Sequence, residues 1–354
     1  MRPERSILIT GATGLLGREV LGRLLASDPR LRAYALARDP RGLASDARVV
    51  PVVGDLRADG LALSPNDRDA IRRDVSAIIH IAADTTFSAP LDRARSVNTR
   101  GTARVLELAN ECASAVHVAY VSTAFVAGRR TGPIAEVASC ATSWVNAYEQ
   151  SKHEAETLVR EQAASWMILR SSTVVCDDAS GRVTQVNAVH RALRLYHHGL
   201  AAMMPGVPDS SVDAVTADSV ADAIARLALR SDVAGETVHL CAGDGALPLD
   251  ELLDITYARW AQHPEWRRRR VARPVVADLA TYTLFERTIE QVGDASLRRL
   301  TRALSHFVPQ LALPKRFQTT NAERLLGHRA PPVRAFWLPM IDNLVARHSI
   351  RRAA

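Results

Sequence analysis

The sequence lacks a hydrophobic run long enough to cross a membrane. A membrane-spanning helix needs about 18 or more consecutive apolar residues. The longest apolar segments, at 75–83 and 274–285, are interrupted by His80 and Asp278. The first residues run directly into a strand-like segment, without the apolar stretch and cleavage site of a secretory leader. We therefore expect neither a transmembrane segment nor a leader.

Cysteine is scarce, with four residues far apart at positions 112, 140, 176 and 241. No two of them form a CxxC pair, whereas structural zinc sites and the disulfide frameworks of small secreted domains rely on closely spaced cysteines. The scarcity predicts no metal site and no disulfide framework, and it favours the reducing cytoplasm. Internal repeats are absent too, which argues against a repeat architecture.

The excess of positive charge is small. The chain has 45 Lys and Arg against 38 Asp and Glu, a net charge of +7, so we expect most charges to pair locally and no nucleic-acid partner. The densest basic cluster is a run of four arginines at 267–270, after Trp266. It fits a solvated helix end or loop, or alternatively a landing patch for a phosphate-rich or acidic partner.

The first half of the chain alternates strand-like and helical segments. The expected strands are 6–10, 33–37, 49–53, 76–82, 116–122 and 167–171, and the expected helices are 19–26, 102–111 and 147–161. This alternation is typical of βαβ units, which build a parallel sheet covered on both faces. The sequence predicts an α/β fold, a Rossmann-type doubly wound parallel sheet with a smaller, mostly helical C-terminal substrate subdomain.

The rhythm loosens after about residue 172. A helix at 220–229 and a short strand at 236–240 are still clear, and the chain from 247 onward looks mostly helical. We predict an NADP-binding Rossmann domain over residues 1–175 and a substrate-binding region over 176–354. Within the second region, about residues 212–245 are expected to return to the Rossmann core.

A glycine-rich segment, Thr-Gly-Ala-Thr-Gly-Leu-Leu-Gly at 10–17, follows the first strand and opens the first helix. Glycines in this position let the chain turn tightly and let the backbone approach a pyrophosphate, which the N–H groups of the helix N-terminus then bind. The spacing exceeds that of GxGxxG by one residue. The context predicts a dinucleotide site, and a glycine-rich turn without a ligand is the alternative.

The end of the second strand bears on the choice of cofactor. An acidic residue there binds the ribose hydroxyls of NAD, and an arginine accepts the 2′-phosphate of NADP. Arg38 and Asp39 are adjacent, and neighbours in a strand point to opposite faces. We favour Arg38 and NADP(H), with Arg18 as a second cation. Asp55 and Leu56, after the third strand, are candidates to contact the adenine.

A candidate for proton transfer lies at the start of the helix at 147–161. Tyr148 and Lys152 are four residues apart, which places both on one helix face. A nearby ammonium group lowers the pKa of a tyrosine, so we expect a lowered pKa for Tyr148. The same lysine can hold the ribose hydroxyls of the cofactor, so Tyr148 and Lys152 are also candidates for cofactor binding. Thr123, at the end of the preceding strand, can bind a substrate carbonyl oxygen, and capping of the strand end is the alternative role for Ser122 or Thr123.

These motifs together resemble the extended short-chain dehydrogenase/reductase superfamily. The resemblance rests on TGxxGxxG, the strand-end Ser-Thr, YxxxK, His-Ile-Ala-Ala-Asp at 80–84, Val-Asn-Thr-Arg-Gly-Thr at 97–102 and Leu-Arg-Ser-Ser-Thr-Val at 169–174, and it covers roughly residues 5–245. It implies that the pyrophosphate contacts Gly11, Thr13, Gly14, Leu15, Leu16 and Gly17, that Ala82 and Ala83 line the adenosine side, and that Thr123, Tyr148 and Lys152 are catalytic.

Within the superfamily the sequence is similar to thioester reductases and fatty acyl-CoA reductases. The similarity rests on segments 121–126, 148–156, 212–223 and 316–322. It implies NADPH-dependent reduction of an acyl thioester, carried by coenzyme A or an acyl carrier protein, to the aldehyde or on to the alcohol. The alternatives are a ketone or aldehyde reductase, a nucleotide-sugar epimerase or dehydratase, and a non-catalytic NADP-binding protein. The oligomeric state stays open, with a homodimer as one alternative.

Overall fold

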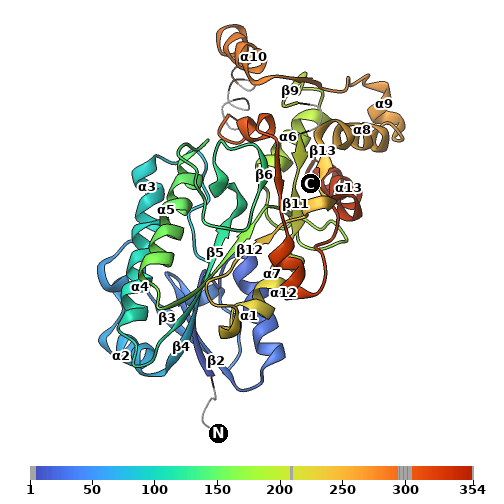
Figure 1. Ribbon diagram of the computed structural model, residues 1–354. Coiled ribbons are helices and arrows are strands. Elements are labelled where there is room, and N and C mark those ends of the chain that lie inside the picture. The colour runs from blue at the N-terminus through green and yellow to red at the C-terminus, as the bar shows by residue number, and fades with distance from the viewer. Residues whose placement is uncertain are drawn as a thin grey trace.

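A computed structural model shows an elongated molecule with a Rossmann-type body and a helical region beyond the carboxyl ends of its strands (Figure 1). The structure describes residues 5–207, 210–293 and 305–352, and residues 295, 298 and 301 between the last two ranges; side chains are described as far as residue 346. The start of the predicted range 1–175 and the end of the predicted range 176–354 therefore lie outside the described residues. No described helix combines the length and the apolar character needed to cross a membrane.

The body contains a sheet of seven parallel strands. In sequence order they are β1 (Arg5–Thr10), β2 (Leu31–Ala37), β3 (Val49–Val53), β4 (Val75–His80), β5 (His117–Thr123), β7 (Ser165–Ser171) and β12 (Thr237–Leu240). Their order in space is β3-β2-β1-β4-β5-β7-β12, which confirms the predicted doubly wound sheet. The chain reverses direction across the sheet between β1 and β4, and ligands of such sheets bind outside the carboxyl ends of the strands at this point.

Helices cover both faces of the sheet, as alternate burial along β1 shows. Ile7 and Ile9 belong to a core with helices α1 (Leu15–Ser27), α7 (Ala217–Leu227) and α12 (Thr320–Leu326). Leu8 points to the opposite core, which includes residues of α2 (Pro65–Asp74), α4 (Arg100–Asn110) and α5 (Ala147–Gln162); α3 (Leu91–Asn98) lies beside α4 and α5 (Figure 1). A sheet buried on both faces explains why its strands read as continuous apolar runs.

Some boundaries differ from the predicted ones. The fourth strand ends at His80 rather than 82, because Ile81 and Ala82 leave the sheet and form the loop beside the glycine-rich turn. The first helix begins at Leu15 rather than 19, directly after Gly14, which is its N-cap. Helices α2 and α3 were not predicted from the sequence. Their mean hydropathy is low, so few apolar residues mark a buried face.

The C-terminal region is mostly helical over the residues that the structure describes. Its helices are α6 (Ala188–His197), α8 (Leu249–Trp260), α9 (Pro264–Arg268), α10 (Leu279–Val292) and α13 (Val333–Arg352). Three buried tryptophans, Trp260, Trp266 and Trp337, anchor a separate apolar core in this region. Large aromatic side chains bury much apolar surface per residue, which suits a small core of this kind.

Short pairs of strands tie this region to the body. The pairs that do so are β8 (Thr173–Cys176) with β11 (Ala214–Thr216) and β6 (Gly132–Ile134) with β15 (Lys315–Phe317), while β9 (Met203–Pro205) with β14 (Val275–Ala277) and β10 (Ser211–Val212) with β13 (Leu247–Pro248) join segments within this region. The β6–β15 pair matters most for the site, because it draws residues 315–326 back across the body. Ala322 and Leu326 of α12 then join the core under α1 and α7.

Candidate active site

The glycine-rich turn forms a cradle at the N-terminus of α1. Gly11 has a φ of +78°, and a Cβ there would lie 2.7 Å from the backbone nitrogen of Ala82. A Cβ on Gly17 would lie 2.0 Å from the carbonyl oxygen of Gly11. Only glycine fits both positions, and the turn closes with a 2.9 Å hydrogen bond from the Gly14 N–H to the Gly11 carbonyl. The free N–H groups of the first helical turn and the helix dipole suit a pyrophosphate.

Buried polar contacts fix the loop that follows β4. The Thr10 hydroxyl lies 2.6 Å from His80 Nδ1 and accepts a hydrogen bond from the Ala82 N–H at 3.2 Å. Burial lowers the pKa of His80 to about 3, so this histidine is neutral. Asn98 pairs with the backbone of Asp84 through two hydrogen bonds and also donates to the Ser151 hydroxyl of α5. The loop is therefore held at a set distance from both the cradle and the helix that carries Tyr148.

Arg38 and Asp39 point in different directions at the end of β2. Arg38 is exposed and lines the cleft. Asp39 turns away, caps a short helical turn and forms an ion pair with Arg41 at 2.6 Å. Arg18 is exposed beside Gly42, in the same loop region, and does not line the cleft. Arg38 faces the cleft and fits a phosphate at this place, whereas Asp39 does not line the cleft.

Asp55 and Leu56, the candidates for contact with the adenine, follow the end of β3. The Arg57 guanidinium donates hydrogen bonds of 2.7 to 3.2 Å to the Asp55 carboxylate and lowers the pKa of Asp55 to about 2. The carboxylate stays ionised and keeps acceptor capacity for an amine. Leu56 is buried and supplies an apolar wall. Both residues line the cleft.

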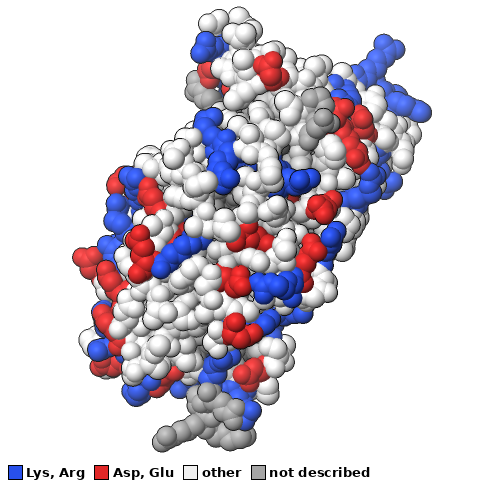
Figure 2. All heavy atoms as spheres, in the orientation of Figure 1, with Lys and Arg blue, Asp and Glu red and all other residues white. Residues whose placement is uncertain are grey.

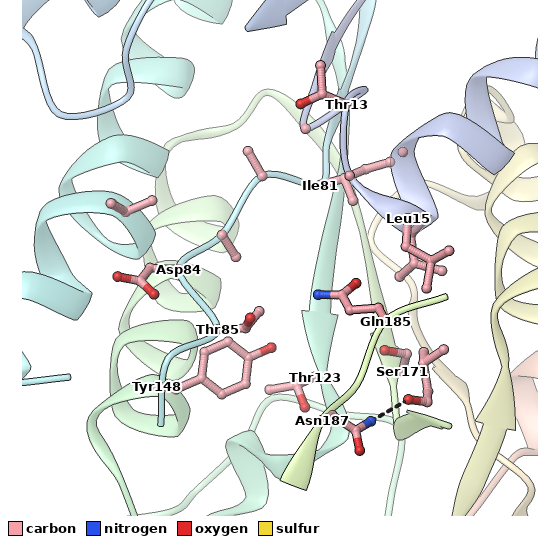
Figure 3. Close-up of a pocket in the computed structure, with 18 of the residues that line it drawn as sticks. Thr13, Leu15, Ile81, Asp84, Thr85, Thr123, Tyr148, Ser171, Gln185 and Asn187 are labelled. Carbon is pink, nitrogen blue, oxygen red and sulfur yellow. Dashed lines mark hydrogen bonds between the residues drawn. The ribbon is translucent and has the colours of Figure 1, made fainter. Parts of the chain in front are cut away.

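Tyr148 and Thr123 meet at the other end of the cleft. Asn146 caps the start of α5, so Tyr148 lies in the first turn of the helix, and Thr123 is the last residue of β5. Figure 3 shows the Tyr148 ring, the Thr123 side chain and the Gln185 amide around the same space. The Thr123 hydroxyl accepts from the Phe125 N–H at 3.3 Å and so caps the strand end, while its own O–H remains able to donate.

Lys152 lies behind Tyr148 rather than on the cleft surface. Its Nζ donates to the Val121 carbonyl at 2.7 Å and lies 4.0 Å from the centre of the Tyr120 ring. Burial lowers the pKa of Lys152 to about 7, against the opposing charge of Glu156. The expected lowering of the Tyr148 pKa is wrong for this structure: burial raises it to about 12, and a hydrogen bond with Thr123 offsets only part of the rise. Tyr148 is therefore a neutral phenol, which is a proton donor.

A buried ion pair anchors α5 to the sheet one turn beyond Lys152. The Arg170 guanidinium of β7 holds both oxygens of Glu156 at 2.7 and 2.9 Å, and both side chains are 1 % exposed. Arg160 adds a third contact at 3.0 Å. These cations lower the pKa of Glu156 to about 2, against the effect of burial. The pair fixes the part of α5 from which Lys152 and Tyr148 extend.

The cleft has a volume of about 1020 Å³, at the large end of the range for ligand pockets. Except for Lys152 and Arg18, it brings together the site residues predicted from the sequence, namely Gly11, Thr13, Gly14, Leu15, Leu16, Gly17, Arg38, Asp55, Leu56, Ala82, Ala83, Thr123 and Tyr148. The structure places Lys152 in the layer behind them. Within the described residues, no cluster of three or more His, Cys, Asp or Glu is arranged to hold a metal ion.

Sequence reasoning missed several residues of the cleft wall. Phe87 lies 5.5 Å from the Tyr148 ring and stacks on Phe307 at 6.2 Å. Gln185 and Asn187 reach the same space from the segment before α6 (Figure 3). None of these four residues belongs to a spaced motif, so the sequence carried no local signal for them. The tertiary fold alone brings residue 307 next to residue 87.

The four arginines at 267–270 lie away from the cleft. They are exposed at the end of α9, while Trp266 is buried and donates to the His197 carbonyl at 2.9 Å. None of them lines the cleft. Figure 2 shows basic side chains gathered at the edge of the molecule where Figure 1 places α9, whereas charges of both signs alternate elsewhere on this face.

The fold and the glycine cradle together place the protein in the class of Rossmann-type dinucleotide-binding proteins. Residues 43–224, just over half of the chain, match the NAD-binding family described as male sterility protein, and the chain belongs to this family. The match begins after the glycine cradle, which supplies an independent sign of the same class. The sequence also fits the extended short-chain dehydrogenase/reductase superfamily and its thioester reductase branch, as predicted.

The alignments with curated relatives cover only part of the length of each relative. Fatty acyl-CoA reductase 8 of Arabidopsis thaliana is 28 % identical over 165 residues, which cover 38 % of this chain and 33 % of the plant protein. The highly reducing polyketide synthase calA of Penicillium decumbens is 29 % identical over 285 residues, covering 72 % of this chain and 9 % of the synthase. The chain thus spans about a third of the length of the first relative and a tenth or less of the second.

Two solved structures resemble this fold over nearly the whole chain. The terminal R domain of the myxalamid PKS-NRPS pathway superposes with a TM-score of 0.78 at 26 % identity, covering 98 % of this chain and 91 % of that domain. The reductase domain of a nonribosomal peptide synthetase from Mycobacterium tuberculosis gives a TM-score of 0.68 at 22 % identity, covering 99 % and 93 %. The second likeness shows the fold alone.

Proposed function

We propose that this protein is an NADPH-dependent reductase that converts an acyl thioester to the aldehyde and free thiol. The observation that carries the proposal is the joint placement of Tyr148 and Thr123 in the same cleft as the glycine cradle. One relative is named fatty acyl-CoA reductase, and the solved structure at 26 % identity is the terminal R domain of a PKS-NRPS pathway, which together support a thioester as the substrate. The substrate is carried by coenzyme A or by a carrier protein.

The cofactor preference follows from the end of β2. Arg38 faces the cleft and can bind a 2′-phosphate, while Asp39 does not line the cleft. Gly11, Gly14 and Gly17 would hold the pyrophosphate, and Asp55 would accept from the adenine amine. Lys152 lies behind Tyr148 and does not line the cleft, and its ammonium ties α5 to β5 through the Val121 carbonyl. When bound, NADPH supplies the hydride that reduces the carbonyl carbon.

Tyr148 and Thr123 act on the carbonyl oxygen of the thioester. The Tyr148 phenol, with a pKa raised to about 12, holds its proton at neutral pH and donates it to this oxygen as negative charge develops. The Thr123 hydroxyl donates a second hydrogen bond to the same oxygen. Preorganised donors of this kind are usually the largest source of transition-state stabilisation. The resulting hemithioacetal loses its thiol when the C–S bond breaks, and an aldehyde remains.

The test is an NADPH-oxidation assay with acyl-CoA thioesters in which free thiol is measured in parallel. Release of one thiol for each NADPH identifies the aldehyde as the product, and one thiol for two NADPH identifies the alcohol. Oxidation of NADPH with aldehydes or ketones but without thiol release from any thioester would overturn the proposal. Carrier-bound thioesters belong in the same panel, because one solved structure with this fold is a thiolation-reductase di-domain.

The Tyr148→Phe variant tests the proton donor. We expect kcat to fall by about 100-fold or more, because general acid catalysis contributes at least this much, while the Kd for NADPH stays near the parent value. Tyr257→Phe is the matched control, because Tyr257 lies on α8 and does not line the cleft. Unchanged turnover in Tyr148→Phe would exclude Tyr148 as the donor.

A further inference from the structure

A second, small pocket adjoins the cleft on the side of the C-terminal region. Its volume is about 40 Å³, more than the roughly 10–15 Å³ that one water molecule needs. Phe125, Thr173, Val175, Val189 and Phe307 line both cavities, so the pocket borders the space in front of Tyr148 and Thr123. If the proposed function holds, the acyl chain of the substrate is the group that reaches it.

Most of the pocket wall is apolar, and includes Val175, Val212, Leu311, Leu313, Phe317 and Trp337. Into this wall the fold also places Lys315, which is 5 % exposed, Gln310 and Asp213. Burying a charged or polar group next to hydrocarbon is costly unless the group finds hydrogen-bond partners. Asp213 accepts hydrogen bonds of 2.9 Å from the backbone N–H groups of Ala242 and Gly243, which gives it a structural role. A pocket that served only a saturated chain would be better lined without Lys315 and Gln310.

Lys315 is unusual in this chain. Of the 45 basic Lys and Arg residues, only Lys152 and Lys315 are lysine, and both are buried. Arginine fills every other position, including all of the exposed ones. Lysine differs from arginine in carrying a compact point charge on a flexible stem, which can turn its donors toward a single acceptor.

Among the described residues, the Lys315 ammonium has acceptors for two of its three N–H groups. Its Nζ donates to Gln310 Oε1 at 2.7 Å and to the Leu313 carbonyl at 3.4 Å. Among the described residues these are its hydrogen-bond acceptors, and an ammonium has three N–H groups. Burial lowers the pKa of Lys315 to about 8, so the group stays mostly protonated at neutral pH. Gln310 is itself fixed, because its Nε2 donates to Glu149 Oε1 at 2.6 Å.

We propose that this pocket is a specificity subsite in which Lys315 binds an oxygen atom of the acyl chain, so that the preferred substrates are oxygenated acyl thioesters rather than plain saturated ones. The matching groups are a hydroxyl or a carbonyl oxygen along the chain, which accept a hydrogen bond from the ammonium. A site built to hydrogen-bond a substrate oxygen discriminates strongly against the analogue that lacks it, because its buried donor is left unpaired.

The first readout is turnover. Octanoyl-CoA is compared with a series of hydroxyoctanoyl-CoA thioesters, each with one hydroxyl at a different carbon of the chain. We expect the parent protein to have a kcat/KM about tenfold or more higher for at least one hydroxylated thioester than for octanoyl-CoA. Lys315→Met removes the donor with little change in length, and should abolish this preference. A parent protein that favours octanoyl-CoA over every hydroxylated form, or a Lys315→Met variant that keeps the preference, would overturn the subsite.

The second readout is independent of turnover. Lysine labelled with ¹³C at Cε gives two side-chain NMR signals in this protein, and Lys315→Met assigns them by deleting one. Octanamide and its hydroxylated forms are added to the protein with bound NADP. We expect a hydroxylated amide to shift the Lys315 signal more than octanamide does; equal shifts, or none, contradict the subsite. A selective shift without reduction of any thioester would uphold the subsite and reject the proposed function.

The melting temperature of Lys315→Met and its Kd for NADPH show whether the variant is folded. If it is not, Gln310→Leu replaces it, because this change removes the acceptor that orients the ammonium. We then expect the same loss of discrimination, and a preference unchanged from the parent would again count against the subsite.

Discussion

Replacement of Gly17 by alanine tests whether the cradle at α1 binds the cofactor. The new Cβ would lie 2.0 Å from the Gly11 oxygen and 2.6 Å from the Gly11 carbonyl carbon, whereas ordinary contact begins at 3.4 Å. Both atoms are backbone, so the turn itself must move by more than a rotamer change could provide. Overpacking of this kind costs about 1–3 kcal/mol. The displaced turn also carries the N–H groups that are to bind the pyrophosphate.

The matched control lies five residues further along the same helix. Gly22 is exposed, and a Cβ there would meet no atom within 4 Å. Gly22→Ala should therefore raise the free energy of unfolding by up to about 1 kcal/mol, the difference in helix propensity between alanine and glycine. The two variants make the same chemical change in one helix, so any difference between them reflects the cradle.

The assay is a fluorescence titration with NADPH, with thermal unfolding measured alongside. We expect Gly17→Ala to raise the Kd by tenfold or more, which corresponds to about 1.4 kcal/mol, and to lower the melting temperature. Gly22→Ala should leave the Kd unchanged. If Gly17→Ala bound NADPH as tightly as the parent, the cofactor could not lie in this cradle. Equal weakening in both variants would point to a general effect on α1.

Two further predictions concern Arg38 and Glu156. Arg38→Ser should lower the ratio of kcat/KM for NADPH to kcat/KM for NADH about tenfold or more, because a charge-assisted contact with the 2′-phosphate is lost. Arg41→Ser is the control and should leave this ratio unchanged. An unaltered ratio in Arg38→Ser would refute phosphate binding by Arg38. Glu156→Gln should cost about 3–5 kcal/mol in denaturant unfolding at pH 7, because Arg170 is left buried and unpaired. In the folded protein the pKa of Glu156 is lowered from 4.5 to about 2. The ion pair therefore stabilises the fold fully above about pH 4.5 and loses this contribution as pH falls toward 2. The difference in unfolding free energy between parent and variant should shrink over that range. A difference that stayed constant with pH would contradict this account.

Local sequence patterns were sufficient for the body of the fold. The strand at 49–53 matches β3 residue for residue, and the helix predicted at 147–161 is one residue shorter than α5. Buried parallel strands are continuous apolar runs, so they are visible without knowledge of their neighbours. Helices α2 and α3 lack such a signal, because few apolar residues mark their inner faces.

The environment of the reacting groups was beyond local reasoning. The spacing of Tyr148 and Lys152 suggested a lowered tyrosine pKa, but burial dominates and raises it to about 12. Burial depends on what packs over a side chain, and here the cover includes Phe87. No window of sequence around Tyr148 contains that information.

The sequence by itself determined the strands of the sheet, the glycine turn that leads into α1, and the residue types offered for cofactor binding and proton transfer. Each depends on residues close together in the chain, so short-range spacing suffices to show them. Only the tertiary structure decided that Arg38 rather than Asp39 faces the cleft, and that Phe307, Gln310 and Lys315 adjoin the space in front of Tyr148. The placement of Phe307, Gln310 and Lys315 depends on the β6–β15 pairing and on packing between segments more than 150 residues apart, as in the hydrogen bond between Gln310 and Glu149.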